Sequence, residues 1–304
     1  MKNIFTFAKE FRQRVGAVLS MNQRNLEYIY PSNNRVDFPI ADDKLLTKKY
    51  LLKAGVPHPE TYQVYGYFFD LRNLDLDLSE RSDFVIKPAR GSGGGGIIVI
   101  VRKENGYWYS VGGKQYSLED LRRHMCDIIF GIYSFGIRDE VVIEQRIIQH
   151  DSVNEITEGG LADVRLIVYQ HQPIMAMMRL PTSASDGKAN LHQGAIGVGV
   201  DIDSGITIHA THEGSYLDAH PDSNVFLIGR KIVYWSDIIK IGIQISNLVP
   251  LKYLGVDIAV SHEGPKVLEI NVRPGIEIQN VNGKGMRRIL AATRQMQLDV
   301  TKGA

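Results

Sequence analysis

The chain has little cysteine, little net charge and no long hydrophobic run among its 304 residues. Its one cysteine, Cys126, cannot form an internal disulfide, which favours a reducing compartment and predicts a cytoplasmic protein. The 35 Lys and Arg residues nearly balance the 34 Asp and Glu residues, so overall charge gives no reason to expect nucleic-acid binding. No apolar run approaches the roughly 18 to 20 residues that a membrane-spanning helix needs. We therefore expect a globular protein with no nucleic-acid partner and no transmembrane segment.

Residues 1–41 are predicted to form a separate helical segment. Ile4, Phe7 and Phe11 recur at helical spacing, and basic residues lie on the opposite face. Such a helix could lie on a membrane surface or pack against the body of the protein. We expect the second arrangement.

The rest of the sequence mixes helical and extended patterns, which predicts an α+β protein. Residues 162–210 alternate short strand runs with turns, as is typical of an antiparallel meander. Residues 253–260 and 266–270 are predicted to form a hairpin. Helices are expected from Asp42 or Asp43 to just before Gly55, over 117–130 and 236–248, and from about 286, with further strands over 83–87, 97–102 and 141–144.

The most conspicuous motif is the glycine-rich run from Gly91 to Gly96. Its spacing satisfies the dinucleotide-binding pattern, but that pattern opens a helix, whereas this run leads into an apolar β-branched strand. The lysine of a Walker loop and the downstream motifs of a protein kinase are also missing. The remaining interpretation is a hairpin whose backbone NH groups cover a triphosphate, with Lys87 just before it. The alternative is a surface linker.

A second motif consists of Asp257, Glu269 and Asn271 on neighbouring predicted strands. Residues two apart on a strand face the same side, so Glu269 and Asn271 should converge, and the hairpin can bring Asp257 opposite them. Two carboxylates and an amide oxygen are ligands that suit Mg²⁺ shared with phosphates. The alternative is an exposed acidic face, which the apolar neighbours make less favourable. The sequence therefore predicts a metal site here.

Taken together, these residues resemble the ATP-grasp superfamily, and within it the RimK-type glutamate ligases. The resemblance runs from about Asp42 to about Gly275 in unbroken order, and it implies an α+β ATP-grasp fold without the separate domain that usually precedes it. The implied division is an N-terminal helical segment over 1–41, a subdomain with the glycine loop over 42–142, and a subdomain with the metal hairpin over 143–304. The motifs that carry the resemblance are ADDKLLTKKYLL, FVIKPARGSGGGG, VIEQRII, ADVRLIVY, MMRLP, DGKANLHQGA, LGVDIAV and VLEINVRPG.

The resemblance also implies roles for individual residues. The phosphates would be held by Lys44, Lys87, Lys188 and Asn190, and covered by Gly93 and Gly94. The adenine would meet Glu144, Gln145, Arg146 and Ile147, and the ribose would meet Asp163. The acceptor carboxylate or the transferred phosphoryl group would face Arg165, Arg179 and Arg273.

The implied reaction is ATP-dependent ligation of a carboxylate to an amine, through an acyl phosphate and with release of ADP and phosphate. ATP and one or two Mg²⁺ ions, or Mn²⁺, would be required, and the partners would be a carboxylate acceptor and an amino acid or other amine. The product could be a peptide, a modified protein tail or a small molecule, and a homo-oligomer stays open. The alternatives are a phosphotransferase of the same fold and a catalytically inactive ATP-binding module that regulates a partner.

Overall fold

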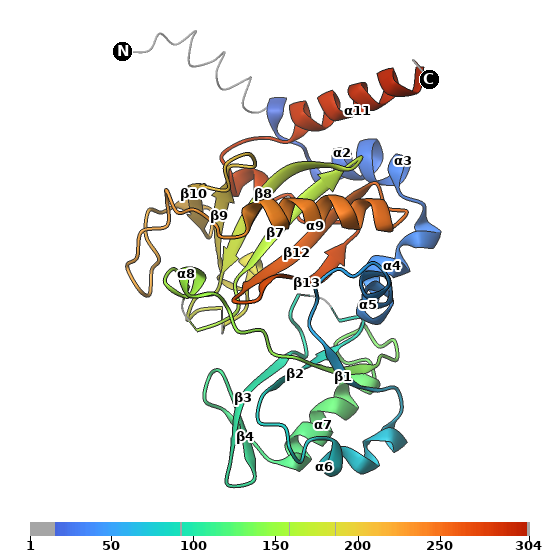
Figure 1. Ribbon diagram of the computed structural model, residues 1–304, viewed down its shortest axis with the longest axis vertical. Coiled ribbons are helices and arrows are strands. Elements are labelled where there is room, and N and C mark those ends of the chain that lie inside the picture. Colours follow the sequence, from blue (N-terminus) through green and yellow to red (C-terminus); the bar gives the residue numbers. More distant parts are fainter. Residues whose placement is uncertain (1–15, 92, 158, 186, 303–304) are drawn as a thin grey trace.

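The computed structural model describes residues 16–302 apart from 92, 158 and 186, and it contains two antiparallel sheets. The sheets lie one above the other along the longest axis, each with its own helices (Figure 1). Each sheet has a separate hydrophobic core. The α+β class expected from the sequence is confirmed, and so is the strand-to-strand setting of the glycine run, which joins the strands Phe84–Pro88 and Ile98–Glu104.

The smaller sheet has the strand order β1-β6-β2-β3-β4-β5. Helix α7 (Leu118–Ile129) packs on it and buries Leu121 and Met125 against Phe84 and Ile86 of the sheet. The bounds are β1 Thr61–Tyr65, β2 Phe84–Pro88, β3 Ile98–Glu104, β4 Tyr107–Ser110, β5 Gln115–Tyr116 and β6 Val141–Glu144, with η3 Phe68–Asn73 and α6 Leu74–Asp77 beside α7.

The larger sheet has the order β11-β10-β9-β8-β7-β12-β13, so the predicted meander and the predicted hairpin join in one sheet. Helix α9 (Trp235–Leu248) lies across one face (Figure 1). Gly242 permits this close approach, because a Cβ there would overlap Leu166 of the sheet. The bounds are β7 Asp163–Tyr169, β8 Gln172–Leu180, β9 Ile196–Val200, β10 Thr207–His212, β11 Ser215–Tyr216, β12 Tyr253–Ser261 and β13 Gly264–Asn271.

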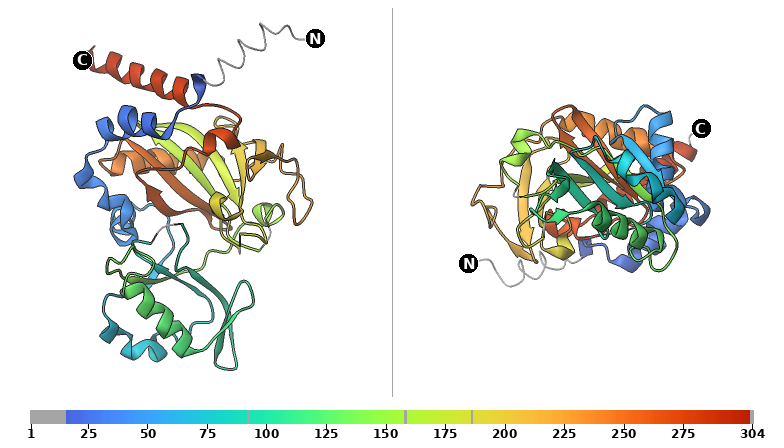
Figure 2. Two further views of the ribbon diagram at one scale, coloured as in Figure 1. Left: turned by 180° about the vertical axis from the view of Figure 1, so that it is seen from behind. Right: turned by 90° about the horizontal axis from the view of Figure 1, so that it is seen from below.

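The beginning of the described chain lies beside the segment that precedes the C-terminal helix, at the far end of the larger sheet (Figure 2). Buried Gln279 joins them, because its side chain bonds both backbone groups of Leu19 and accepts from the backbone NH of Met286. The helix predicted from Ile4 onward lies outside the described residues. The remaining helices are α2 Met21–Gln23, the π-helix η1 Arg24–Ile29, α3 Tyr30–Ser32, η2 Arg35–Asp37, α4 Pro39–Asp42, α8 Asp151–Asn154, η4 Leu191–Gln193, α10 Ile278–Val281 and α11 Arg287–Lys302.

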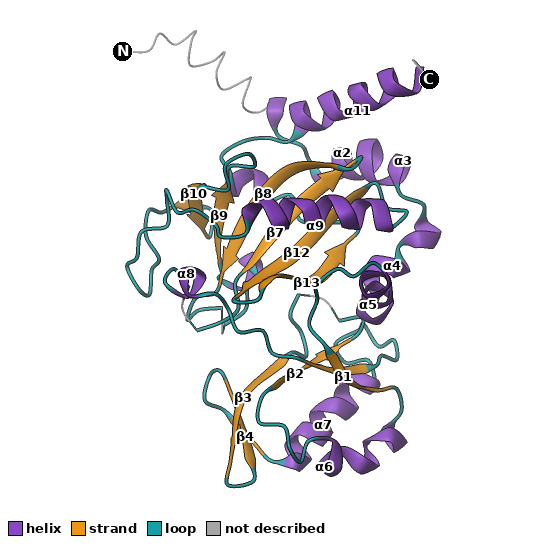
Figure 3. Cartoon of the chain, in the orientation of Figure 1, coloured by secondary structure: helices purple, strands orange, loops and turns teal. Residues whose placement is uncertain are grey.

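Helix α5 (Lys44–Lys53) lies beside β13, between the two sheets (Figure 3). Asp43 caps it by accepting from the NH groups of Leu45 and Leu46. Its Leu51 belongs to the core of the larger sheet, whereas the amine of Lys48 reaches Glu144 of the smaller sheet. This helix therefore fixes the two sheets relative to each other. Within the described ranges, no helix is long and apolar enough to cross a membrane.

Candidate active site

The first part of the site is a buried group that we call the lysine cluster, formed by Lys48, Lys87 and Glu144. Both lysine amines lie 2.5 Å from the Glu144 carboxylate, Lys48 at Oε2 and Lys87 at Oε1. Burial opposes ionisation of Glu144, but the two lysines together hold its pKa below the ordinary value. Lys48 also donates to Pro59 O at 3.0 Å and to Thr61 Oγ1 at 2.7 Å. The cluster thus carries one surplus positive charge, and its Lys87 belongs to β2, the strand that leads into the glycine loop.

Lys48 was not among the residues that the sequence singled out. It lies four positions after Lys44 on α5, so the two side chains share a helix face. This spacing could have identified Lys48 as a candidate site residue from the sequence. Burial lowers the pKa of Lys48, and Lys87 lowers it further, while Glu144 raises it.

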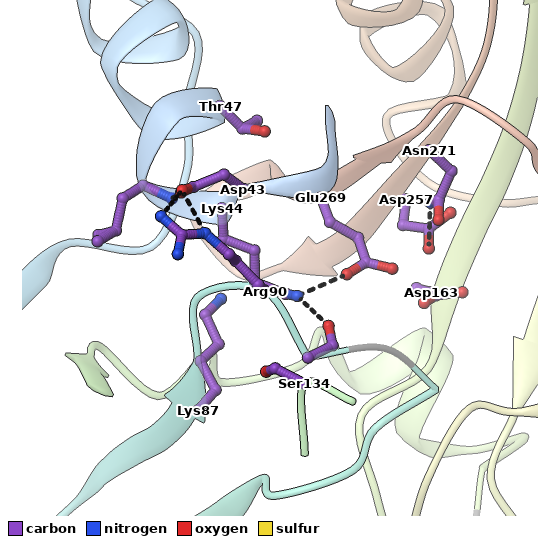
Figure 4. Close-up of polar contacts among 12 residues, drawn as sticks. Asp43, Lys44, Thr47, Lys87, Arg90, Ser134, Asp163, Asp257, Glu269 and Asn271 are labelled. Carbon is purple, nitrogen blue, oxygen red and sulfur yellow. Dashed lines mark hydrogen bonds and ion pairs between the residues drawn. The ribbon is translucent and has the colours of Figure 1, made fainter. Parts of the chain in front are cut away.

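The second part of the site is the acidic set of Asp257, Glu269 and Asn271. Asp257 pairs directly with Glu269 in the β12–β13 register, and Asn271 Nδ2 lies 3.3 Å from Asp257 Oδ2. The Glu269 carboxylate also lies 3.7 Å from the amine of Lys44 (Figure 4). The three side chains therefore converge, as the hairpin pattern predicted.

Two arginines occupy the buried end of this acidic set. Arg165 binds Asp257 with two bonds of 2.8 and 2.6 Å, and Arg179 binds both Asp257, at 2.7 Å, and Asp163. We call these four residues the arginine–aspartate cluster. This pairing could not be predicted from the sequence, because it depends on β8, β7 and β12 lying side by side. Arg165 and Arg179 thus bind aspartates in the structure, where the resemblance implied contacts to substrate.

The pKa values of the two aspartates in this cluster are shifted in opposite directions. Burial raises the pKa of Asp163 to about 6, against the pull of Arg179 and with the help of the nearby Asp257 charge. Burial acts in the same direction on Asp257, but Arg165 and Arg179 together hold its pKa well below the ordinary value. Asp257 is therefore the carboxylate that stays ionised.

The acidic set fits a divalent cation by the chemistry of its donors. Among the described residues no group of three His, Cys, Asp or Glu side chains is placed to hold a metal. A cation would therefore use the two carboxylates together with the amide of Asn271, which is a hard-oxygen set of the kind that Mg²⁺ binds beside phosphates. Glu269 is the ligand with an accessible carboxylate, since its side chain is 34% exposed, against 1% for Asp257.

Side chains from α5 and from residues 190–193 hold the glycine loop at Gly91 and Gly93. The amine of Lys44 donates to Gly91 O at 2.7 Å, and the amides of Asn190 and Gln193 both donate to Gly93 O at 3.1 Å. Gln193 was missed by the sequence argument, although it belongs to the same short motif as Asn190. Lys44 also faces Glu269, so the loop and the acidic set meet at this one amine (Figure 4).

Several of the other predicted residues make contacts outside the lysine cluster and the acidic set. The backbone NH of Gln145 donates to Glu60 O at 2.8 Å, and Arg146 pairs with Asp83 at 3.2 Å. Arg273 is exposed and stacks over Phe38, 5.4 Å from the ring centroid. Of the remaining predicted residues, Ile147 is buried, Gly93 and Gly94 adopt positive φ values of 64° and 80°, and Lys188 lies beside Gly94.

A cavity of about 960 Å³ adjoins the glycine-loop contacts on the larger sheet. Leu191 and His192 line it, while Asn190 and Gln193, on either side of them in the chain, bind Gly93. The segment 190–193 therefore borders the cavity through Leu191 and His192 and contacts the glycine loop through Asn190 and Gln193. The cavity carries both acidic and basic groups, among them Glu213, Glu277, Lys284 and Arg288.

A fold of two α+β parts, with a glycine loop on one and a carboxylate hairpin on the other, defines an ATP-grasp protein. Residues 23–295 match the model of the family described as sugar-transfer associated ATP-grasp. The chain belongs to that family.

Curated relatives confirm the expected resemblance to RimK-type ligases. The chain is 22% identical over 287 residues to a probable alpha-L-glutamate ligase of Aliivibrio fischeri (strain MJ11), covering 91% of this chain and 73% of that protein. It is 24% identical over 283 residues to a protein of the same name from Vibrio cholerae serotype O1 (strain M66-2), covering 89% and 71%. The class to which these relatives assign the chain is the ATP-dependent carbon–nitrogen ligases of the ATP-grasp type.

Solved structures of ATP-grasp ligases also align along the chain. A D-alanine–D-alanine ligase from Bacillus anthracis aligns with a TM-score of 0.49 and 16% identity, covering 87% of this chain and 69% of that one. The ligase PsnB with its minimal precursor aligns with a TM-score of 0.45 and 15% identity, and the alignment spans 86% of this chain and 62% of PsnB.

Proposed function

We propose that the protein is a carboxylate–amine ligase that uses ATP to activate a carboxylate as an acyl phosphate. The observation that carries the proposal is the position of Lys44, whose amine contacts both the glycine loop at Gly91 O and the metal-type carboxylate of Glu269. A cation on one side and a hard-oxygen ligand set on the other is the arrangement that phosphoryl transfer needs. The proposal also keeps the division of the chain into an N-terminal segment over 1–41, a subdomain with the glycine loop over 42–142 and a subdomain with the metal hairpin over 143–304.

The chain's own residues would act mainly by neutralising and orienting charge. Lys87 and Lys44 would bind the triphosphate, with the NH groups of Gly93 and Gly94 over it. Glu269, Asp257 and Asn271 would hold Mg²⁺ or Mn²⁺, which when bound withdraws charge from the phosphate oxygens. The adenine and ribose contacts at residues 144–147 and at Asp163, and the phosphate contacts of Lys188 and Asn190, are proposed on the family resemblance.

In the reaction a carboxylate oxygen of one substrate attacks the γ-phosphorus, and the bond to the ADP oxygen breaks. The amine nitrogen of the second substrate then attacks the acyl carbon, phosphate leaves, and the amine loses a proton. No side chain of the protein has to act as a nucleophile. Arg165, Arg179 and Arg273 are proposed to face the carboxylate or the transferred group, which for Arg165 and Arg179 requires that they release part of their contact with Asp257.

The cavity beside residues 190–193 is proposed as the place where the acceptor binds. It borders this segment, which contacts the glycine loop, and its mixed acidic and basic lining suits a zwitterionic or partly charged molecule such as an amino acid, a peptide end or a polar metabolite. The names of the relatives support glutamate as the first amino acid to try. We place the reaction in the cytoplasm, where ATP is supplied and a lone thiol such as that of Cys126 stays reduced.

The decisive experiment is ATP turnover with Mg²⁺ against a matrix of amino acids and carboxylates, with the nucleotide product identified. A ligase gives ADP and phosphate only when acid and amine are both present. A phosphotransferase gives ADP with the acid or an alcohol alone. A regulatory module binds ATP and gives no product with any pair, which would contradict the proposal, as would release of AMP.

A further inference from the structure

Two side chains of the smaller part, neither of them included in the site described above, hold the C-terminal end of the glycine loop. His124, on α7, lies with Nε2 at 2.8 Å from Gly96 O. Tyr133, in the segment after α7, lies with its hydroxyl at 3.3 Å from His124 Nδ1, and the two rings are 5.4 Å apart at their centroids. The three residues form a continuous chain of contacts from the loop into the core of the smaller part.

The backbone conformation of Gly96 and its lack of a side chain both suit this contact. Its φ is 75°, and a Cβ there would lie 2.7 Å from two atoms of the Tyr133 ring. Glycine is therefore needed for both the backbone conformation and the close approach of the ring. The Tyr133 ring therefore lies directly against the loop at this point.

The hydrogen bonds assign the tautomer of His124. A carbonyl oxygen only accepts, so Nε2 carries the proton that is donated to Gly96 O. Nδ1 then accepts from the hydroxyl of Tyr133, and a neutral ring provides both bonds. Burial lowers the pKa of His124, against the bond to Gly96, which agrees with a neutral ring.

These contacts fix the direction of the loop backbone. In a planar trans peptide the carbonyl of one residue and the NH of the next point in opposite directions. Holding Gly96 O therefore also orients the NH of Ile97, which lies 3.5 Å from Gly94 O and closes a turn. The tip of the loop, at Gly93, is held by Asn190 and Gln193 of the larger part, whereas the turn is held from within the smaller part.

We propose that His124 and Tyr133 are positioning residues that order the turn Gly94–Ile97 before nucleotide binds, and so set the affinity for Mg-ATP. The proposal rests on the proposed function only in taking the glycine loop as the triphosphate site. A glycine-rich segment loses much conformational entropy when it is ordered, and a loop that is already ordered loses less on binding. The two residues do not touch the substrate in this role.

The test is calorimetric titration of the full chain with Mg²⁺ and a non-hydrolysable ATP analogue. His124→Ala should weaken binding about fivefold, which corresponds to the roughly 1 kcal/mol of one neutral hydrogen bond. His124→Gln, whose amide NH can still reach Gly96 O, should stay within about twofold of the wild type. Arg123→Ala, an exposed neighbour on the same helix, is the matched control and should bind as the wild type does. In turnover, the KM for ATP should rise in His124→Ala while kcat changes less.

Wild-type affinity in His124→Ala, or the same loss in His124→Gln as in His124→Ala, would overturn the positioning role. Should His124→Ala fail to fold, Tyr133→Phe removes the hydroxyl but keeps the ring on Gly96, and a smaller loss of affinity is expected from it. If the wild type itself does not bind the analogue, the proposed function fails and hydrogen exchange of the free protein decides the remaining question. Faster exchange at residues 94–97 in His124→Ala then supports the ordering role, and unchanged exchange refutes it.

Discussion

Both parts of the molecule bury a cluster of charges at the site, and the two clusters are built differently. In the lysine cluster two amines share one carboxylate, that of Glu144, so the cluster keeps one positive charge. In the arginine–aspartate cluster two guanidinium groups meet two carboxylates and cancel, and the neighbouring Glu269 adds a negative charge. The positive side suits a triphosphate and the negative side suits a cation. Under the proposed function, the first cluster would serve nucleotide binding, whereas Glu269, outside the neutral cluster, would serve the chemistry.

The largest effect should come from removing the carboxylate of Glu269, which lies outside the neutral arginine–aspartate cluster. Glu269→Ala should lower ATP turnover by more than about 1,000-fold, roughly 4 kcal/mol of transition-state stabilisation, with thermal stability retained. The Glu269 side chain is 34% exposed, and Lys44, which loses this carboxylate, keeps its hydrogen bond to Gly91 O. Glu263→Ala, an exposed position on the same hairpin, is the control. Normal turnover at saturating Mg²⁺ would remove Glu269 from the metal site.

The opposite result is expected inside the cluster, where stability should fall first. Asp257→Asn keeps the shape but leaves Arg165 and Arg179 without the carboxylate that they share. Breaking a buried ion pair from one side costs about 3–5 kcal/mol, so the urea midpoint should drop sharply even without Mg²⁺. The surface change Asp237→Asn on α9, at a half-exposed side chain paired only with exposed Lys240, should change the midpoint little. A stable Asp257→Asn protein would mean that the two arginines find other partners.

A third and somewhat smaller effect concerns pH. Because the folded pKa of Asp163 is raised, to about 6, the folded protein binds this proton more tightly than the unfolded chain does. Its stabilising contribution is therefore complete below about pH 4 and is lost as the pH rises through 6, an amount of at most about 3 kcal/mol. The urea-unfolding free energy of metal-free wild type and Asp163→Asn, compared between pH 4 and pH 7, measures it. Parallel pH profiles of the two proteins would contradict the assignment.

The residues of the site that lie close together in the chain could be predicted from the sequence, because local periodicity places them. Glu269 and Asn271 are two apart in a β-branched run, and the strand period of two places them on one face whatever the rest of the chain does. Lys87 likewise lies near the end of β2, a few residues before the glycine run. Features of this kind depend on residues close together in the chain.

The remainder depended on contacts between distant segments. Arg165 binds Asp257 across 92 positions because β7 lies between β8 and β12, and a shift of one residue in register would place the two on opposite faces. Gln193 contacts Gly93 across 100 positions. No periodicity in either segment specifies such partners. Lys48 is different, since its position four residues after Lys44 made it predictable.

The smallest effect should separate the two lysines of the first cluster. Lys87→Ala leaves Glu144 paired with Lys48, so the fold should persist, while ATP affinity should fall by the roughly 1.5–3 kcal/mol of a charge-assisted contact to phosphate. Lys48 donates to Pro59, Thr61 and Glu144, so Lys48→Ala should lower the melting temperature more and the affinity less. Calorimetry with Mg-ATP and thermal unfolding of both variants measure this contrast. Equal losses of affinity would make the cluster a single binding unit, and unchanged affinity in Lys87→Ala would place the triphosphate elsewhere.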